Sequence, residues 1–158
     1  MTPFEQAFIK TIGHEGGYSN DPADPGKETK YGISKRAHPN EDIPSMTLER
    51  AKLIYLRDYW TPAWCHRLPA EVATEVFDAA VNCGVGAAVR FLQRALRVSD
   101  DGMVGPITLR AVGECHSIGG LLARFNGHRL MYHTDLKNWP NHGRGWAKRI
   151  AKNLMEVQ

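Results

Sequence analysis

The chain has 158 residues, of which 42% are hydrophobic and 23% charged, and its formal net charge is +3. These values are typical of a soluble globular protein that is long enough for one domain with a hydrophobic core. No run of about 18 apolar residues is present, which argues against a membrane-spanning helix. The N-terminal sequence has neither a basic segment nor an apolar core, so we expect synthesis in the cytoplasm without a secretory signal.

Cysteine content and charge give two further expectations. Cys65, Cys83 and Cys115 are too few and too scattered for a disulfide framework, so we expect reduced thiols. Residues 1–60 carry 8 Lys/Arg and 9 Asp/Glu, whereas residues 61–158 carry 12 and 8. A basic C-terminal half suits an anionic partner such as nucleic acid, cell wall polymer or membrane surface, but a solvated helix face explains it equally well. Because no aromatic–basic motif accompanies the charge, we expect no nucleic-acid partner. The lack of a long apolar run leads us to expect no stable membrane insertion.

Apolar residues at helical spacing, together with capping residues, indicate a mainly α chain. Helices are predicted over residues 3–15, 47–60, 70–82, 87–96, 106–112, 118–135 and 144–156. Residues 16–44 are rich in Gly, Pro, Asp and Asn and predict a long loop, with short strands around residues 30–34. A second loop is predicted over residues 138–143. The expected fold is therefore a helical bundle of the α+β class, with an irregular or small β insert after the first helix.

The motif His14-Glu15-Gly16-Gly17-Tyr18 ends the first predicted helix. Phe4, Phe8 and Ile12 share one apolar face of that helix, and Glu15 falls within the same arc. Apolar neighbours and the negative end of the helix dipole both disfavour a charged carboxylate, which raises its pKa. A lone Glu near a helix end is usually a surface residue, but a neutral Glu beside two glycines has the properties of a general acid.

A second carboxylate and a hydroxyl follow in the loop, at Asp24 and Thr29. Hydrolysis of a glycosidic bond needs a proton donor and a carboxylate across the sugar that activates water or attacks directly. Glu15 fits the donor, Asp24 in a polar loop fits the base, and the Thr29 hydroxyl fits a group that orients water. Asp21 is the alternative base, and turn formation is the alternative role for Asp24. A bond to loop backbone is the alternative for Thr29.

The segments Glu15–Tyr18, Asn20–Gly26 and Thr29–Ser34, in this order, resemble glycoside hydrolase family 108. Members of that family are phage endolysins and bacterial N-acetylmuramidases with a Glu-Gly-Gly-Tyr motif. The resemblance continues through Phe77–Gly84 and Asp101–Thr108. It implies a lysozyme-like fold of one domain over residues 1–158, in which residues 1–66 form the catalytic half. Residues 67–158 resemble the family's predicted peptidoglycan domain.

The resemblance also implies roles for individual residues. The motif Glu is catalytic in the family, which implies the same role for Glu15. The Glu, Asp, Thr order resembles the wider phage lysozyme superfamily, where the gap between Asp and Thr is commonly one residue longer than that between Asp24 and Thr29. One departure is Lys27, where the family pattern leads us to expect the second Gly of a Gly-Gly pair.

The implied activity is that of a muramidase, which cuts the β-1,4 bond between N-acetylmuramic acid and N-acetylglucosamine in bacterial peptidoglycan. The implied role is lysis of the host wall by a phage endolysin, or wall editing during protein secretion. A non-catalytic peptidoglycan-binding module is the alternative, in which Glu15 would be incidental. We expect a monomer that acts on glycan strands at the cell wall.

Four further residues are candidates for lining a sugar cleft: Tyr18, Tyr31, Trp60 and Asn82. Aromatic rings offer flat apolar faces to sugars, and Asn offers both hydrogen-bond donors and acceptors. Core packing is the alternative for Trp60, and helix capping is the alternative for Asn82. The histidines and cysteines lack metal-ligand spacing and no phosphate-binding loop is present, so we expect neither a metal nor a cofactor.

Overall fold

The computed structural model describes residues 1–13, 17–23 and 25–157. Within these ranges the chain forms seven α-helices and a three-stranded antiparallel sheet, which confirms the mainly α fold with a small β insert. The helices are α1 (Pro3–Ile12), α2 (Leu48–Tyr55), α3 (Ala70–Cys83), α4 (Val85–Leu96), α5 (Pro106–Gly113), α6 (Ile118–Thr134) and α7 (Trp139–Met155). The strands are β1 (Ser19–Asn20), β2 (Glu28–Lys30) and β3 (Ile33–Ser34). A π-helical turn (Leu56–Trp60) and a 3₁₀ turn (Cys65–Arg67) connect α2 to α3.

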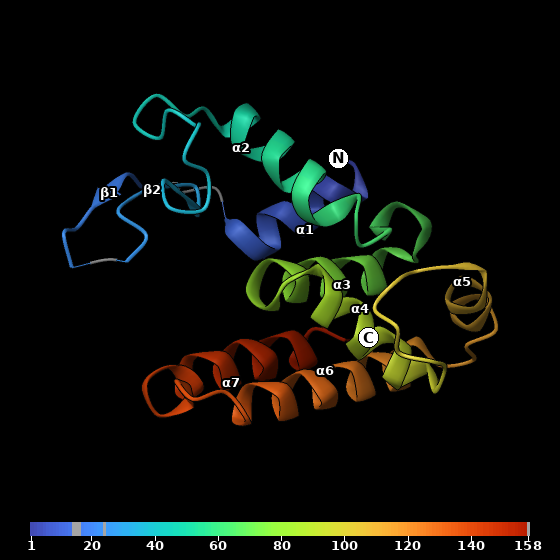
Figure 1. Cartoon of the computed structure of the whole chain (residues 1–158). Coiled ribbons are helices and arrows are strands. Elements are labelled where there is room, and N and C mark those ends of the chain that lie inside the picture. The colour runs from blue at the N-terminus through green and yellow to red at the C-terminus, as the bar shows by residue number, and fades with distance from the viewer. Residues whose placement is uncertain (14–16, 24, 158) are drawn as a thin grey trace.

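The helices are arranged in three layers around α3 (Figure 1). Helices α1 and α2 lie above α3 in this view, and α6 and α7 run side by side below it. Helix α3 contacts α1, α4 and α6, so it joins the N-terminal and C-terminal parts of the chain. The β insert projects beyond the helices next to the end of α1 (Figure 1).

Helix α1 begins and ends with well-defined caps. The Thr2 hydroxyl accepts a hydrogen bond from the Glu5 N–H, and the Glu5 carboxylate accepts one from the Thr2 N–H, which forms a capping box. The helix ends at Ile12, and Gly13 caps it with a φ of 84°. The predicted helix over 3–15 therefore stops earlier among the described residues. Gly13 ends it with a positive φ that glycine adopts readily, and its N–H donates to the Ile9 carbonyl oxygen.

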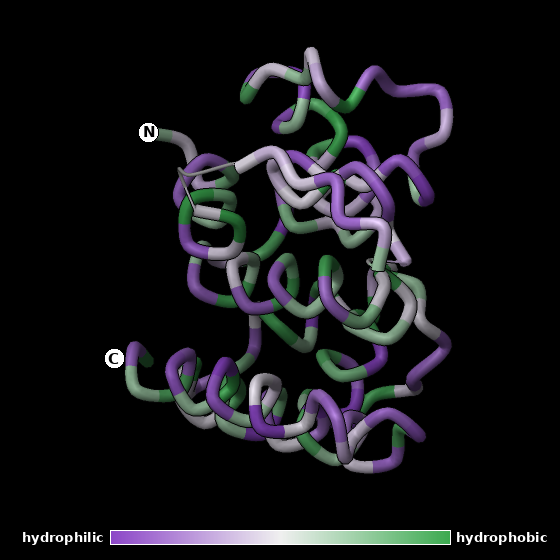
Figure 2. The backbone as a smooth tube through the Cα atoms, turned by 90° about the vertical axis from the view of Figure 1, so that its left-hand side faces the viewer, coloured by the Kyte–Doolittle hydropathy of each residue, from purple (hydrophilic) through white to green (hydrophobic). Residues whose placement is uncertain are grey.

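Helix α7 begins at Trp139, so the loop predicted over residues 138–143 is wrong. Pro140 lies in the first turn, where its missing N–H costs no hydrogen bond. A Cβ atom at Gly143 would overlap the indole of Trp139, so this glycine makes room for a ring of its own helix. Hydrophilic and hydrophobic residues alternate along α7, at the lower edge of Figure 2, as expected for a helix with one packed and one exposed face.

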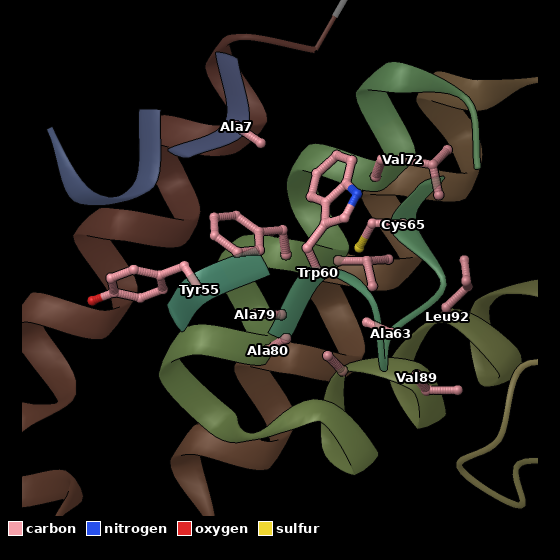
Figure 3. Close-up of a cluster of buried hydrophobic side chains, with 14 of the residues drawn as sticks. Ala7, Tyr55, Trp60, Ala63, Cys65, Val72, Ala79, Ala80, Val89 and Leu92 are labelled. Atoms are coloured by element: carbon pink, nitrogen blue, oxygen red, sulfur yellow. The ribbon is translucent and has the colours of Figure 1, made fainter. Parts of the chain in front are cut away.

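One hydrophobic cluster joins the layers. Figure 3 shows Trp60, Ala79 and Ala80 within this cluster, with Val72 beside them. The cluster extends from Phe8 in α1 to aromatic residues of α4 and α6, so both halves of the chain contribute to it. The largest fully buried apolar side chains are Phe8, Phe77, Phe91, Phe125, Ile33, Ile43, Ile54, Leu92 and Leu121.

The β2–β3 hairpin turns through two residues, Tyr31 and Gly32, which both have positive φ (50° and 75°). Two such residues are typical of a type I′ turn, whose twist matches that of the strands. The Tyr55 hydroxyl of α2 donates a hydrogen bond of 3.1 Å to the Tyr31 carbonyl oxygen. A Cβ atom at Gly32 would overlap that hydroxyl. The turn is therefore fixed against α2, and Gly32 permits the close approach.

Lys27 adopts a φ of 59°, in the left-handed region that favours glycine. This conformation accounts for the glycine expected here from the family pattern. In this region a residue with a side chain is strained by about 1–2 kcal/mol. A glycine avoids this strain, but its greater conformational freedom in the unfolded chain offsets part of the gain in stability. We expect Lys27→Gly to raise the free energy of unfolding by up to about 1 kcal/mol, measured by urea denaturation.

The matched control for this substitution is Arg36→Gly. Arg36 is exposed in the neighbouring turn, and its φ is not positive. There a glycine only adds unfolded-state entropy, so the same change should lower the free energy of unfolding by about 0.5–1 kcal/mol. Equal losses in the two variants would contradict the assigned strain at Lys27.

Within the described ranges, no helix combines the length and the apolar character needed to cross a membrane.

Candidate active site

The two predicted catalytic carboxylates, Glu15 and Asp24, lie outside the described residues. Their sequence neighbours are described, and these locate the motif in the fold. Gly17 belongs to the Glu-Gly-Gly-Tyr motif and lines a pocket of about 310 Å³. The described part of the site consists of Gly17 and the side chains that share this pocket with it.

This pocket, which we call the cleft, is lined by residues from six parts of the chain. They are the end of α1, the motif glycine Gly17, the β2–β3 turn, α2, the end of α3, and α7. Its lining includes Thr11, Gly17, Tyr31, Tyr55, Asn82 and Arg149. An open pocket beside a motif glycine leaves room for a ligand to approach the backbone closely.

Two of the four predicted sugar-binding residues, Tyr31 and Asn82, line the cleft. Tyr31 is half-buried at the hairpin turn. Asn82 is exposed at the end of α3, and its amide nitrogen donates a hydrogen bond of 2.7 Å to the Asp78 carbonyl oxygen. Asp78 precedes Asn82 by four residues in α3, so the Asn82 side chain bonds back to its own helix. Asn82 lies near the end of α3 and also lines the cleft.

Tyr18 and Thr29 lie in the β insert, where both make local contacts. The Tyr18 ring is 47% exposed, and its hydroxyl donates to the Glu28 carboxylate at 2.8 Å. This bond raises the pKa of the Tyr18 phenol. The Thr29 hydroxyl donates to the Lys27 carbonyl oxygen at 3.5 Å, the contact with loop backbone that was the alternative to a catalytic role. Neither residue is among those that line the cleft.

Trp60 is a core residue, and the prediction that it lines the sugar cleft is wrong. Its side chain is 5% exposed and packs edge-on against Phe4 and Phe77, with ring centroids 5.4 and 5.7 Å away. Figure 3 shows the indole enclosed by buried side chains. The ring has no free face for a sugar, because α1 and α3 cover it. Its apolar area is instead buried in the core, where aromatic pairs of this geometry stabilise the fold.

Asp21, the alternative base, shapes the loop. Its carboxylate oxygen accepts a hydrogen bond of 2.9 Å from the Ala23 N–H. A side chain that bonds the backbone two residues ahead is an Asx turn. Asp21, predicted as the alternative base, therefore has the turn-forming role that was the alternative for Asp24.

Beneath the cleft lies a buried ionic cluster formed by Asp78, Arg129 and Arg149, called the Asp78 cluster below. The Arg129 Nη1 donates to Asp78 Oδ2 at 2.7 Å, and these side chains are only 1% and 4% exposed. The Arg149 guanidinium donates to both carboxylate oxygens of Asp78 and also, at 3.1 Å, to the Thr11 carbonyl oxygen. Burial raises the pKa of Asp78, but the hydrogen bonds and charges of the two arginines outweigh it and hold that pKa below its ordinary value.

A second cluster lies one helical turn earlier on α3. The Glu75 carboxylate accepts hydrogen bonds from Lys10, Asn126 and Asn153 at 3.1–3.3 Å. Asn153 also donates to Asp78, which links the two clusters. A pocket of about 450 Å³ lies beside Glu75 and contains no motif residue. Because these partners already satisfy the Glu75 carboxylate, we assign this cluster to the packing of α1, α3, α6 and α7.

None of Glu75, Asp78, Arg129 and Arg149 was predicted from the sequence as a functional residue. A signal was nevertheless present, because Glu75 and Asp78 are three residues apart in a helix whose other inward positions are apolar. Two acidic residues on a buried helix face require partners, since an unpaired buried charge is very costly. The identity of the partners could not be read in advance, because they come from α1, α6 and α7 and are 51 to 78 residues away in the sequence.

The remaining titratable side chains give no second site. All three cysteines lie in the described ranges and are unpaired, and burial raises the pKa of the Cys65 thiol to about 12. Burial likewise raises the pKa of Cys83, whose sulfur lies 3.6 Å from His133 Nε2. Across residues 1–13, 17–23 and 25–157, no group of three or more His, Cys, Asp or Glu side chains is arranged to hold a metal ion.

On α7, Arg144, Lys148 and Lys152 are exposed, whereas Arg149 turns inward.

The architecture defines the class of fold to which the protein belongs. A mainly helical chain with a small antiparallel sheet after the first helix, and a cleft where that sheet meets α3, has a lysozyme-like fold. Residues 8–84 match the family model described as Glycosyl hydrolase 108, and residues 87–151 match the one described as Predicted Peptidoglycan domain. Residues 8–84 are therefore a glycosyl hydrolase 108 segment, and the chain is a peptidoglycan-acting lytic enzyme or binder.

A solved structure supports the same assignment. The chain superimposes on the structure of Brucella abortus SagA with a TM-score of 0.84 and 28% sequence identity. The match covers 98% of this chain and 92% of that one. No curated protein sequence matches the chain.

Proposed function

We propose that the protein is a muramidase, which hydrolyses the β-1,4 bond between N-acetylmuramic acid and N-acetylglucosamine in peptidoglycan. Glu15 is the general acid that protonates the leaving glycosidic oxygen, and Asp24 is the carboxylate across the sugar. Tyr31 and Asn82 contact the glycan in the cleft. The protein acts at the cell wall on glycan strands, without a cofactor and as a monomer.

The observation that carries this proposal is the position of Gly17 in the cleft. Gly17 follows Glu15 by two residues, so the motif and the cleft are close in the chain. The hydrolase model spans residues 8–84 and thus includes Glu15, Asp24 and Thr29. The Asx turn at Asp21 favours Asp24 as the second carboxylate, because Asp21 is already bonded to the loop backbone.

The bond that is cut is tested by product analysis. Purified sacculi are digested with the protein, and the new reducing ends are reduced with borohydride and identified by mass spectrometry. A muramidase yields muramitol. Glucosaminitol would identify cleavage of the other glycosidic bond, and saturable binding to sacculi without new reducing ends would identify a binding module. Either of the last two results would overturn the proposal.

A pair of aspartate variants tests the second carboxylate. We expect Asp24→Asn to lower the rate of sacculus hydrolysis at least about 100-fold, because an amide can neither accept a proton nor attack the sugar. Asp21→Asn should remain within about threefold of the wild type, because the Asn carbonyl oxygen can still accept the hydrogen bond from the Ala23 N–H. Comparable losses in both variants, or a larger loss for Asp21→Asn, would exclude Asp24 as the base.

A further inference from the structure

We propose that Arg149 of α7 binds a carboxylate of the muramoyl portion of peptidoglycan and so makes the cleft selective for peptidoglycan over uncharged amino-sugar polymers. This inference rests on the proposed function and adds to it a specificity-determining residue. Arg149 lies within the segment matched by the predicted peptidoglycan domain, whereas Gly17, Tyr31 and Asn82 lie within the segment matched by the hydrolase model. The cleft is therefore completed by a side chain from the other segment.

The guanidinium of Arg149 is accessible from the cleft. Arg149 lines the cleft together with Gly17 and Asn82, and its side chain is 35% exposed. Arg129, the other arginine of the Asp78 cluster, is 1% exposed and is not among the cleft residues. Of the two cations paired with Asp78, only Arg149 can therefore reach a ligand in the cleft.

The Asp78 cluster carries an excess of positive charge. Asp78 carries one negative charge, and the two arginines carry two positive charges. The cluster therefore keeps a net charge of about +1, since arginine stays protonated at any relevant pH. The pKa of His133, packed near this cluster, is lowered by burial and also by the charge of Arg129. An anionic ligand group in the cleft would offset the excess positive charge.

The guanidinium of Arg149 is preorganised by its partners. Asp78 and the Thr11 carbonyl oxygen hold Nε and Nη2 of Arg149 in place, while Nη1 makes no hydrogen bond to any described residue. A fixed guanidinium loses little side-chain freedom when it binds a carboxylate. Asp78 is in this sense the positioning residue for Arg149.

The chemistry of the substrate supplies the anion. N-acetylglucosamine is uncharged, whereas N-acetylmuramic acid bears a lactyl carboxylate, which is free where no stem peptide is attached. Where a stem peptide is attached, the lactyl group is an amide and the peptide carries the carboxylates. A single arginine in the cleft recognises either source through the same charge-assisted hydrogen bonds.

The test measures binding in the Glu15→Gln background, so that it does not depend on catalysis. Titration calorimetry compares three ligands: peptide-free glycan strands, strands that carry stem peptides, and a chitin oligosaccharide of the same length. We expect Arg149→Met to weaken binding of at least one anionic ligand about 10- to 100-fold and to leave the chitin oligosaccharide unchanged. A loss confined to peptide-free strands assigns the lactyl carboxylate, and a loss confined to peptide-bearing strands assigns the stem peptide.

Two controls separate this effect from net charge and from folding. Lys148→Met removes a charge from an exposed position of the same helix and should change none of the three affinities. Arg149→Lys keeps the charge but not the planar fork, so it should weaken anionic binding several-fold, and it replaces the Met variant if that one fails to fold. Equal losses for anionic and neutral ligands, or no loss for any ligand, would overturn the inference. Failure of the muramidase proposal would appear separately, as sacculi left uncut by the wild-type protein.

Discussion

Replacement of Glu15 by Gln is expected to lower the rate of peptidoglycan hydrolysis by at least about 10³-fold, because glutamine has nearly the same shape but no acidic proton to give to the leaving oxygen. The rate is measured as the release of reducing ends from purified sacculi. Binding of glycan strands should persist, since the cleft residues Tyr31, Asn82 and Arg149 are unchanged. The variant would then be a lysis-defective protein that still holds its substrate.

The matched control for this variant is Glu49→Gln. Glu49 is an exposed carboxylate in the first turn of α2 and is not a cleft residue. Its replacement should leave hydrolysis within about twofold of the wild type, because surface changes away from such a site have small effects. Full hydrolysis by Glu15→Gln would remove the proposed general acid. Loss of activity in both variants would point to a global defect, which the unfolding curves would reveal.

The second large effect is expected for Asp78→Asn, which should lower the free energy of unfolding by about 3–5 kcal/mol. The change leaves Arg129 buried, and Arg149 partly buried, without the negative charge that both share. The loss would report the cost of uncompensated buried cations rather than the net value of an ion pair. Urea denaturation of the wild type and the variant measures it directly.

An exposed ion pair provides the control for Asp78. Asp100 pairs with Arg94 at 2.6 Å, and both side chains are about 45% exposed. Asp100→Asn should therefore cost less than about 1 kcal/mol. A cost similar to that of Asp78→Asn would contradict the assigned role of burial.

The stabilisation by Asp78 also has a defined pH dependence. Because the pKa of Asp78 is lower in the folded protein than in the unfolded chain, the carboxylate stabilises the fold above the unfolded value of about 3.9. This contribution is lost as the pH falls through the folded pKa. The difference between wild type and Asp78→Asn should hence be constant near neutral pH and shrink below about pH 4.

The sequence predicted those features that depend on local periodicity. The buried stripe Val72, Val76 and Ala80 indicated α3, and the turn-rich segment after α1 indicated the β insert. Two errors in helix bounds have local causes: Gly13 ends α1 early, and Gly143 lets Trp139 fold onto α7, so that a glycine-containing segment is helical. The glycine that makes room for Trp139 is itself a residue that usually indicates a loop, so the sequence did not show that α7 begins at Trp139.

The site was predictable only in part, because packing against side chains distant in sequence determines which residues line the cleft. Tyr31 and Asn82 were predicted because an aromatic ring and an amide suit a sugar, and both residues line the cleft. Trp60 was misassigned since one-dimensional reading cannot tell which face of its helix Phe4 and Phe77 cover. Arg149 was missed because its sequence context is that of several basic residues on a solvated helix, whereas in the structure it points inward to Asp78 and the Thr11 carbonyl oxygen.

The Asp78–Arg149 contact has a consequence for recombination between relatives. It crosses the boundary between the two matched segments, residues 8–84 and 87–151. The two segments of this chain are thus not interchangeable between relatives. A chimera that takes α3 from one parent and α7 from another must inherit the acidic and the basic partner together, or it will bring a lone charge into its own interior.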